Sequence, residues 1–303
     1  MAGYVPEKKS PKPLEIRPTY ELLDSVIGAI QVRSDKPELP TGISDLDDLI
    51  WGLHPSELVV IGARPSHGKT SLKVQVAWNL AKLGIPVVFL SLEMSSEQIV
   101  ERIFCNEMSV HGWRLRTGNP QEVKRAIELK DKFLTKLVSS TIQIIDSHGY
   151  TTDEVEYIIK ELGPKVIFID HLQRIRLQGS SRYDALSNYV SRLKELAMKY
   201  KISIVLGSQV NRAGAKEADA INNMKGTGEI EEAADALLIC KWLKRDDADY
   251  ENLNDYEVLV SKQRNGPCDK KIIYFDSRYF KFSNNQSQST VIRQPDYKDR
   301  VAP

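Results

Sequence analysis

The sequence predicts an α/β fold with a mostly parallel central sheet flanked by helices. Short apolar runs alternate with helical stretches along most of the 303 residues, and the apolar runs are continuous. Continuous apolar strands are typical of a parallel sheet that is covered on both faces. The last strands follow one another with few helices between them, which predicts an antiparallel or mixed end to the sheet.

Eight apolar runs are predicted to be strands, at residues 58–62, 87–93, 142–146, 166–170, 202–208, 236–240, 256–262 and 271–275. Helices are predicted between the earlier strands, at residues 70–83, 95–108, 122–138, 152–162 and 183–200. Thr151 and Glu154 fit a capping box at the start of one of these helices.

The ends of the chain differ from this pattern. Residues 1–17 are rich in Pro and Lys and predict a mobile arm. Residues 19–31 predict an amphipathic helix, with an apolar stripe made by Leu22, Leu23, Val26, Ile27 and Ile30. That stripe packs either on its own domain or on a neighbouring subunit, and the residues alone favour neither. We therefore expect an arm (1–17), a linker helix and tether (18–40), a main domain (41–283) and a polar disordered tail (284–303).

Composition restricts the function only loosely. The net charge is +1, so no overall basic field indicates nucleic acid, although a ring could still bind DNA through a few local cations. The three cysteines are scattered and show no zinc or disulfide spacing. No signal peptide or membrane span is visible. These features predict a reduced, cytoplasmic protein that does not enter a membrane.

The segment ARPSHGKT (63–70) predicts a phosphate-binding loop. It lies between an apolar strand and a helix, so backbone N–H groups and the helix N-terminus can face an anion. Lys69 would reach the β and γ phosphates, and the Thr70 hydroxyl would bind Mg²⁺. The alternative is a tight turn with a chance Gly-Lys-Thr. The predicted nucleotide-binding residues are Arg64, Pro65, Ser66, His67, Gly68, Lys69, Thr70 and Ser71.

Two carboxylates end neighbouring apolar strands, where open α/β sheets bind their ligands. Asp170 after VIFI suits Mg²⁺, held mostly through water. Glu93 after VVFLSL suits positioning and deprotonating an attacking water. A helix-capping role is the alternative for Glu93.

Gln209, Lys262 and Arg264 end two further strands. The Gln209 amide could sense a γ-phosphate by hydrogen bonding. Lys262 and Arg264 are two residues apart, so in a strand their side chains point to the same face. Cations placed in this way can stabilise a phosphoryl group during its transfer. The alternative for this pair is a solvated strand end.

Two Gly-containing loops are candidates for DNA binding. One carries Arg182, and the other, NNMKGTGEIEEAAD (222–235), carries Lys225, Gly226, Thr227 and Gly228. Small residues let backbone N–H groups approach phosphates. Neither loop has the aromatic residues of a base-stacking platform, and ordinary surface loops are the alternative.

Taken together, TGISDLDDLIWGLHPSELVVIGARPSHGKTSL, FLSLEMS, IFIDHLQ, GSQVNR, GTGEIEEAAD and KQRNG resemble the motor domain of DnaB-type replicative helicases. The resemblance covers roughly residues 18–283, and Ala63 is no departure within the family. It implies a RecA-like P-loop NTPase fold and a ring, usually a hexamer, around single-stranded DNA, with ATP and Mg²⁺ between subunits.

The resemblance also implies roles for the candidate residues. Lys69, Thr70 and Asp170 would hold phosphates and Mg²⁺, Glu93 would be the catalytic base, and Gln209 would couple the γ-phosphate to the DNA loops. Lys262 and Arg264 would reach the neighbouring subunit's site. The helix at 19–31 would dock on that neighbour.

Three departures from the family pattern accompany the resemblance. No helical collar precedes the linker helix in this sequence, which is then either a motor-only fragment or a compact relative that forms its ring without a collar, as would suit a viral or plasmid genome. Primase binding through a collar is therefore left open. Gly226 and Ala233 replace residues that are usually charged, and His171 stands where an aromatic residue is usual. The rival functions are a RecA- or KaiC-like ATPase, an ATP-gated DNA-binding scaffold without unwinding, and a small-molecule kinase.

Overall fold

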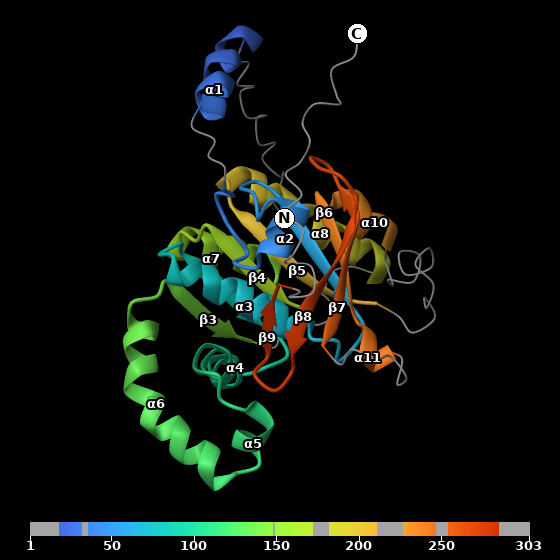
Figure 1. Ribbon diagram of the computed structural model, residues 1–303. Helices are drawn as coiled ribbons and strands as arrows, with labels where there is room; N and C mark the ends of the chain where they lie inside the picture. Colours follow the sequence, from blue (N-terminus) through green and yellow to red (C-terminus); the bar gives the residue numbers. More distant parts are fainter. Residues whose placement is uncertain are drawn as a thin grey trace, which may run out of the picture. The chain divides into compact units, whose positions relative to one another are not determined.

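The computed structural model describes residues 18–31, 36–147, 149–171, 182–210, 227–246 and 254–284. The chain divides into two compact units, residues 1–36 and 37–303. The described residues of the larger unit form a nine-stranded sheet with the order β3-β2-β4-β5-β1-β6-β7-β8-β9 (Figure 1). No helix among the described residues has both the length and the apolar character to cross a membrane.

Six neighbouring strands of the sheet are parallel. They are β3 (Ile142–Asp146), β2 (Val87–Ser91), β4 (Val166–Asp170), β5 (Ser203–Gln209), β1 (Leu58–Ala63) and β6 (Ala236–Trp242). The antiparallel end consists of β7 (Asp255–Gln263), β8 (Lys270–Asp276) and β9 (Lys281–Ser283). The predicted parallel sheet with an antiparallel end is therefore confirmed.

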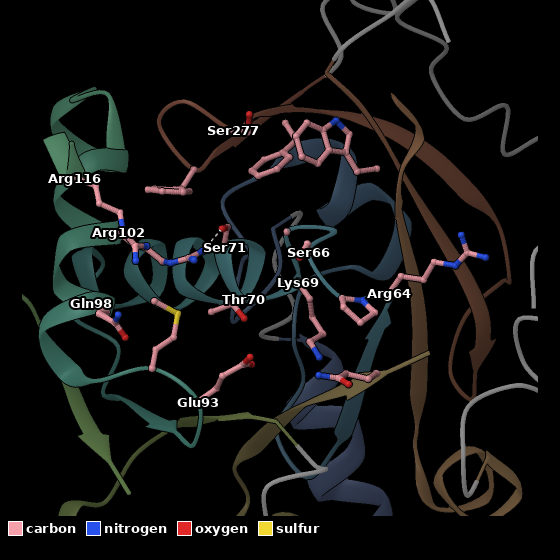
Figure 2. Close-up of a pocket in the computed structure, with 17 residues that line it drawn as sticks. Arg64, Ser66, Lys69, Thr70, Ser71, Glu93, Gln98, Arg102, Arg116 and Ser277 are labelled. Carbon is pink, nitrogen blue, oxygen red and sulfur yellow. Dashed lines mark hydrogen bonds between the residues drawn. The ribbon is translucent and has the colours of Figure 1, made fainter. Parts of the chain in front are cut away.

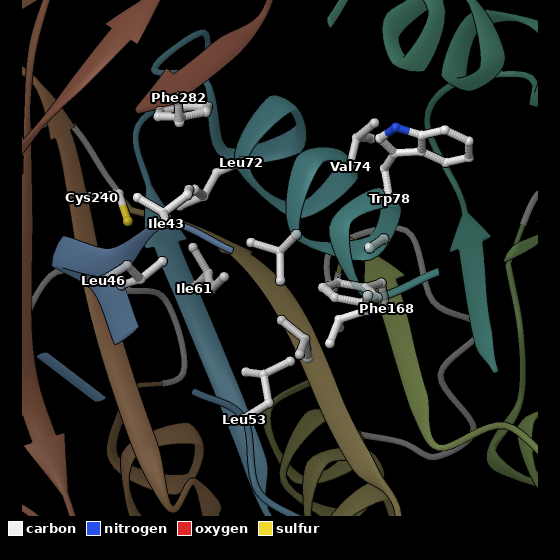
Figure 3. Packing of buried hydrophobic residues seen from close by; sticks show 14 of the residues in the cluster. Ile43, Leu46, Leu53, Ile61, Leu72, Val74, Trp78, Phe168, Cys240 and Phe282 are labelled. Carbon is white, nitrogen blue, oxygen red and sulfur yellow. The ribbon is translucent and has the colours of Figure 1, made fainter. Parts of the chain in front are cut away.

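Alternate residues of the central strands serve two separate cores. On β1, Leu58 and Val60 belong to one buried cluster, whereas Val59 and Ile61 belong to the other, because successive side chains of a strand point to opposite faces. Figure 3 shows the second cluster. Burial on both faces explains why these strands are uniformly apolar.

Helices cover each face of the sheet. The cluster with Val59 receives side chains from α2 (Ser44–Ile50), α3 (Lys69–Lys82), α4 (Ser96–Met108) and α6 (Pro120–Val138). The cluster with Leu58 receives them from α7 (Thr152–Leu162), α8 (Arg182–Tyr200) and α10 (Thr227–Ala233). Two short helices, α5 (Gly112–Arg116) and α11 (Leu243–Asp246), complete this unit's described elements.

The smaller unit contains α1 (Thr19–Gln31), which matches the predicted helix. The residues of its predicted apolar stripe are all exposed. The domain boundaries predicted after residues 17 and 283 adjoin segments outside the described residues, and they stay predictions.

Most predicted elements are present, with local differences. The Thr151 capping box before α7 is confirmed, since the Thr151 and Glu154 side chains accept from each other's backbone N–H groups. The strand predicted over 87–93 was too long, because β2 ends at Ser91. The segment 222–235 was predicted as a loop, but its second half forms α10. The sequence did not predict α2, α5, α11 or β9.

Candidate nucleotide-binding site

A polar cleft of about 540 Å³ opens at the carboxyl ends of β1 and β5 (Figure 2). Every residue of 64–71 lines it except His67, and the predicted Glu93 and Gln209 line it as well. The position agrees with the rule that open α/β sheets bind ligands where parallel strands end.

The loop between β1 and α3 leaves the start of α3 open to a ligand. Gly68 is the N-cap of this 14-residue helix, and no side chain caps it. The first backbone N–H groups of a helix have no partner within it, so an uncapped N-terminus favours an anion. Gly68 has φ +78°, and a Cβ there would lie 3.1 Å from the Phe275 ring. Both the backbone angle and the close approach of the Phe275 ring therefore favour glycine at this position.

His67 anchors this loop instead of lining the cleft. Its buried Nδ1 accepts a hydrogen bond of 3.1 Å from the Trp242 backbone N–H, at the end of β6. His67 was included in the predicted phosphate loop as a residue that tunes the shape of the loop, and its part in nucleotide binding stays a prediction. The contact shapes the loop by joining it to the sheet.

Lys69 is buried with its ammonium group near the end of β5. Its Nζ donates to the Ser208 carbonyl at 3.1 Å. Burial, and to a smaller extent the nearby Lys73, lower the pKa of Lys69 to about 8, although Asp170 opposes both effects. An anionic ligand in the cleft would raise this pKa again and would be bound tightly in return.

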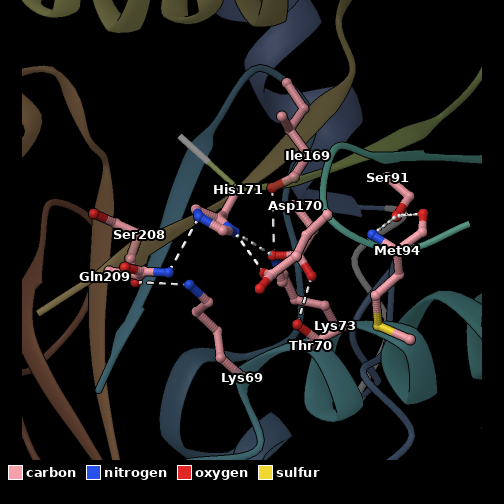
Figure 4. A network of polar contacts seen from close by, with 11 residues as sticks. Lys69, Thr70, Lys73, Ser91, Met94, Ile169, Asp170, His171, Ser208 and Gln209 are labelled. Carbon is pink, nitrogen blue, oxygen red and sulfur yellow. Dashed lines mark hydrogen bonds and ion pairs between the residues drawn. The ribbon is translucent and has the colours of Figure 1, made fainter. Parts of the chain in front are cut away.

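Asp170 lies at the end of β4 between two side chains of α3 (Figure 4). Its Oδ2 accepts from the Thr70 hydroxyl at 2.6 Å, and its Oδ1 is hydrogen-bonded to Lys73 Nζ. Burial alone would raise the pKa of Asp170, but the charges of Lys73 and Lys69 lower it to about 2. The carboxylate is thus ionised, and it adjoins the cleft through its contact with Thr70.

The Thr70 and Asp170 oxygens fit Mg²⁺. Both are hard oxygen donors, which Mg²⁺ prefers, and they lie within hydrogen-bonding distance of each other. Among the described residues no group of three or more His, Cys, Asp and Glu could hold a metal ion. A cation here would therefore take its other ligands from phosphate and water, as Mg²⁺ at nucleotide sites commonly does.

Glu93 follows β2 in a turn and has a 45% exposed side chain. The helix-capping alternative is excluded, because α4 is capped by Ser95 in a capping box with Gln98. Glu93 Oε2 lies 3.0 Å from His171 Nδ1 in ion-pair range, without hydrogen-bond alignment. His171 Nε2 lies 3.1 Å from Gln209 Nε2, so the imidazole bridges the two predicted residues. Burial and Lys69 lower the pKa of His171, which favours the neutral ring.

Lys262 and Arg264 do not reach this cleft. Lys262 Nζ donates to the carbonyls of Glu231 and Glu232 at the end of α10. Arg264 donates to the Glu232 carbonyl at 2.7 Å and to Asp235 Oδ1 at 3.3 Å. Lys262 pairs with Leu237 near the start of β6, whereas the cleft lies where the parallel strands end. The two cations therefore lie at the opposite edge of the sheet.

The sequence reasoning missed several residues of the site. Arg102 and Arg116 line the cleft, and Arg102 donates to the Ser71 hydroxyl at 2.7 Å while lying over the Phe280 ring. Arg102 belongs to an amphipathic helix, in which an arginine is ordinarily read as solvent-facing. The aromatic residues of the cleft are Trp242, Phe275 and Phe280.

The structure describes only some of the residues that were predicted to bind DNA. Arg182 is the first residue of α8, and Thr227 and Gly228 begin α10. Lys225 and Gly226 lie outside the described residues. Arg182, Thr227 and Gly228 are therefore at helix starts instead of within loops.

Comparison with known proteins decides the family. The model of the DnaB-like helicase C terminal domain matches residues 38–284. The chain belongs to this family. It is 33% identical over 266 residues to the replicative DNA helicase DnaC of Bacillus subtilis, covering 83% of this chain and 58% of that protein. It is 32% identical over 262 residues to the replicative DNA helicase DnaB of Geobacillus stearothermophilus, covering 81% and 56%. The chain thus spans just over half the length of these relatives.

Solved structures agree with the fold. The ATPase domain of G40P superposes with a TM-score of 0.81 at 23% identity, covering 90% of this chain and 100% of that one. A DnaB-like replicative helicase, solved in a study of its interactions with primase, gives a TM-score of 0.80 at 23% identity, covering 88% and 68%. The predicted RecA-like α/β fold and the predicted family are therefore confirmed.

Proposed function

We propose that this chain is the ATP-hydrolysing motor of a ring-forming replicative DNA helicase, which translocates on single-stranded DNA and unwinds duplex at the replication fork. The observation that carries the proposal is the division of the site. The phosphate loop and Glu93 line one cleft, and Asp170 is hydrogen-bonded to Thr70 of that loop, whereas Lys262 and Arg264 lie at the opposite edge of the sheet. The named relatives are replicative helicases, so a RecA- or KaiC-like ATPase or a passive scaffold is not favoured.

The residues of the cleft divide the work of hydrolysis. Lys69 and the N–H groups of the phosphate loop bind the β and γ phosphates of ATP, and Thr70 and Asp170 hold Mg²⁺. When bound, Mg²⁺ supplies positive charge that offsets the charge developing on the phosphates. Glu93, which is partly exposed at the cleft, orients and deprotonates the attacking water. Gln209 hydrogen-bonds the γ-phosphate and transmits its presence towards the DNA-binding segments.

A neighbouring subunit completes each site. Lys262 and Arg264 of one subunit reach the γ-phosphate held by the next, and a head-to-tail contact of this kind closes into a ring. The expected ring is a hexamer, and the exposed apolar stripe of α1 docks on the adjacent subunit. Burying that stripe would remove large apolar side chains from water.

The strand-binding role belongs to segments at the starts of α8 and α10. Arg182 and the Lys225–Gly228 segment grip the phosphates of single-stranded DNA, largely through charge and backbone N–H groups. Primase and a helicase loader are further partners that we propose for the assembled protein, and the bacterial cytoplasm is the expected location.

Steady-state ATP hydrolysis tests the proposal most directly. The rate per subunit is measured as protein concentration rises, with and without single-stranded DNA, alongside unwinding of a forked duplex. We expect the rate to climb with concentration and again with DNA. Lys69→Ala serves as the control for contaminating ATPases. A rate that is indifferent to both variables would overturn the ring motor.

A further inference from the structure

Lys73 is a fully buried lysine that the proposed reaction does not use. It lies one turn after Lys69 on α3 and has no exposed side-chain surface. Its Nζ bonds Asp170 Oδ1 and lies 3.5 Å from the Ile169 carbonyl. Residues four apart on a helix share a face, so Lys73 approaches the end of β4 beneath the cleft. An unpaired ammonium in such a position would be costly, which makes the contact with Asp170 obligatory.

The neighbouring strand leaves room for this ammonium. A Cβ at Gly207 on β5 would lie 2.2 Å from Lys73 Nζ and 3.1 Å from Asp170 Oδ1. Any larger residue at this position would displace the ammonium from the carboxylate. Gly207 does not have a positive φ, so no turn requires glycine here. The absence of a side chain at this position instead makes room for the contact between Lys73 and Asp170.

The two oxygens of Asp170 have different partners. Oδ1 is bound to Lys73, and Oδ2 accepts from Thr70, which lies on the cleft side. The contact with Lys73 therefore fixes the rotation of the carboxylate and places a cationic side chain beside its buried oxygen.

We propose that Lys73 is a built-in counter-ion, a positioning residue that holds the Asp170 carboxylate turned towards Thr70 before Mg²⁺ and nucleotide bind. The proposal rests on the proposed nucleotide and Mg²⁺ site. Because Lys73 already neutralises the carboxylate, the nucleotide-free protein gains little from Mg²⁺. Without Lys73 the buried carboxylate lacks its nearest counter-charge, and Mg²⁺ takes over that role.

The test is the melting temperature of the nucleotide-free protein, with Mg²⁺ and with EDTA. We expect wild type to melt at the same temperature in both. Lys73→Met keeps the length of the side chain and removes its charge, so in EDTA it should melt roughly 10 °C lower, as for a broken buried ion pair. Mg²⁺ alone should restore at least half of that loss.

Lys194→Met is the matched control. Lys194 forms another largely buried ion pair, with Asp235 Oδ2 at 2.6 Å, and it does not line the cleft. We expect this variant to lose stability equally in Mg²⁺ and in EDTA. A Lys73→Met variant that behaves in the same way would reduce Lys73 to a structural ion pair and overturn the proposal.

A second variant covers the case in which Lys73→Met does not fold. Gly207→Ala should displace the Lys73 ammonium from Asp170 and give the same Mg²⁺-dependent melting temperature. In the double variant Gly207→Ala/Lys73→Ala, the steric cost of the new methyl group should disappear, because the displaced ammonium is absent. Unchanged, Mg²⁺-indifferent melting of Gly207→Ala would contradict the proposal. Binding of a fluorescent ATP analogue to wild type in Mg²⁺ is measured in parallel. If wild type does not bind the analogue, the proposed function is contradicted. If wild type binds it but the melting temperatures of the variants do not depend on Mg²⁺, only the proposed role of Lys73 is contradicted.

Discussion

Replacing Arg264 by Ala tests whether the catalytic site is shared between subunits. Within its own chain Arg264 donates to the Glu232 carbonyl and to Asp235, and its side chain is 46% exposed. Its backbone N–H still donates to the Asp235 carbonyl after the substitution. Partly exposed contacts of this kind contribute about 1 kcal/mol to the free energy of unfolding, so the variant should fold normally.

The catalytic cost should be far larger than the cost in stability. An arginine supplied by a neighbour typically contributes about 10³ to 10⁵ in rate, which corresponds to roughly 4–7 kcal/mol of activation free energy. Nucleotide binding should change little, because Arg264 does not line the cleft of its own chain. The assays are ATP turnover and equilibrium binding of a fluorescent ATP analogue, with Arg192→Ala as control. Arg192 is a similarly exposed arginine in ion pairs with Glu156 and Glu195.

Mixing two inactive variants extends the test. Lys69→Ala lacks a working phosphate loop but keeps Arg264, so it can complete the site of an adjacent Arg264→Ala subunit. In a randomly mixed equimolar ring about a quarter of the interfaces combine an intact loop with an intact arginine, which sets the expected recovery. Full turnover by Arg264→Ala alone would refute the reasoning. An inactive mixture that binds nucleotide normally would also contradict supply from a neighbour.

Three further predictions address the cleft and the helices beside it, and one of them includes a control substitution. Glu93→Gln should spare nucleotide binding and slow single-turnover hydrolysis by about 10² to 10⁴, and unimpaired hydrolysis would remove Glu93 as the base. Gly68→Ala should cost about 1–2 kcal/mol in backbone strain and weaken nucleotide binding. Gly84→Ala is the control, because Gly84 has the same φ of +78° but no atom within 4 Å of the added Cβ, so this variant should cost only the backbone strain. Equal nucleotide binding by the two variants would contradict the argument that the Phe275 contact at Gly68 matters. Burial raises the pKa of Glu107, but hydrogen bonds from Lys136 and two other donors lower it from 4.5 to about 2. Glu107→Gln should therefore lower the free energy of unfolding by about 2 kcal/mol at pH 7, and this difference should shrink as the pH falls from about 4.5 to about 2, in denaturant titrations. If the variant were still less stable than wild type by the same amount at pH 2, the loss would come from packing instead of from the charge of Glu107.

The central strands could be predicted from sequence because burial on both faces leaves a continuous apolar signal. Leu58 to Ile61 alternate between two cores, and both cores require apolar residues. The start of α10 gave the opposite signal. Thr227 and Gly228 follow a Gly-containing segment that is typical of a loop, and the packing of Ile230 against the core outweighs that local preference.

The site could be predicted where each residue follows a strand end or a phosphate-loop spacing. Lys73 and Arg102 could not be found in this way, because a cation within a helix is ordinarily a solvated residue. One signal for Lys73 was present, since it lies four residues after Lys69 and between the apolar Leu72 and Val74. For Arg102 the contact with Ser71 depends on how α4 packs beside α3, which no local pattern encodes.

The topology of the sheet is consistent with the proposal that a neighbouring subunit completes each site. The phosphate loop, Asp170 and Gln209 lie where parallel strands end, so they share one edge of the sheet. The chain then reverses between β6 and β7, and β7 runs back towards the start of β6. Residues at the end of β7, including Lys262, must therefore lie at the other edge. If Lys262 and Arg264 act on a neighbour's nucleotide as proposed, this separation makes hydrolysis depend on a correctly placed neighbour, and hydrolysis can in turn drive the movement of that neighbour.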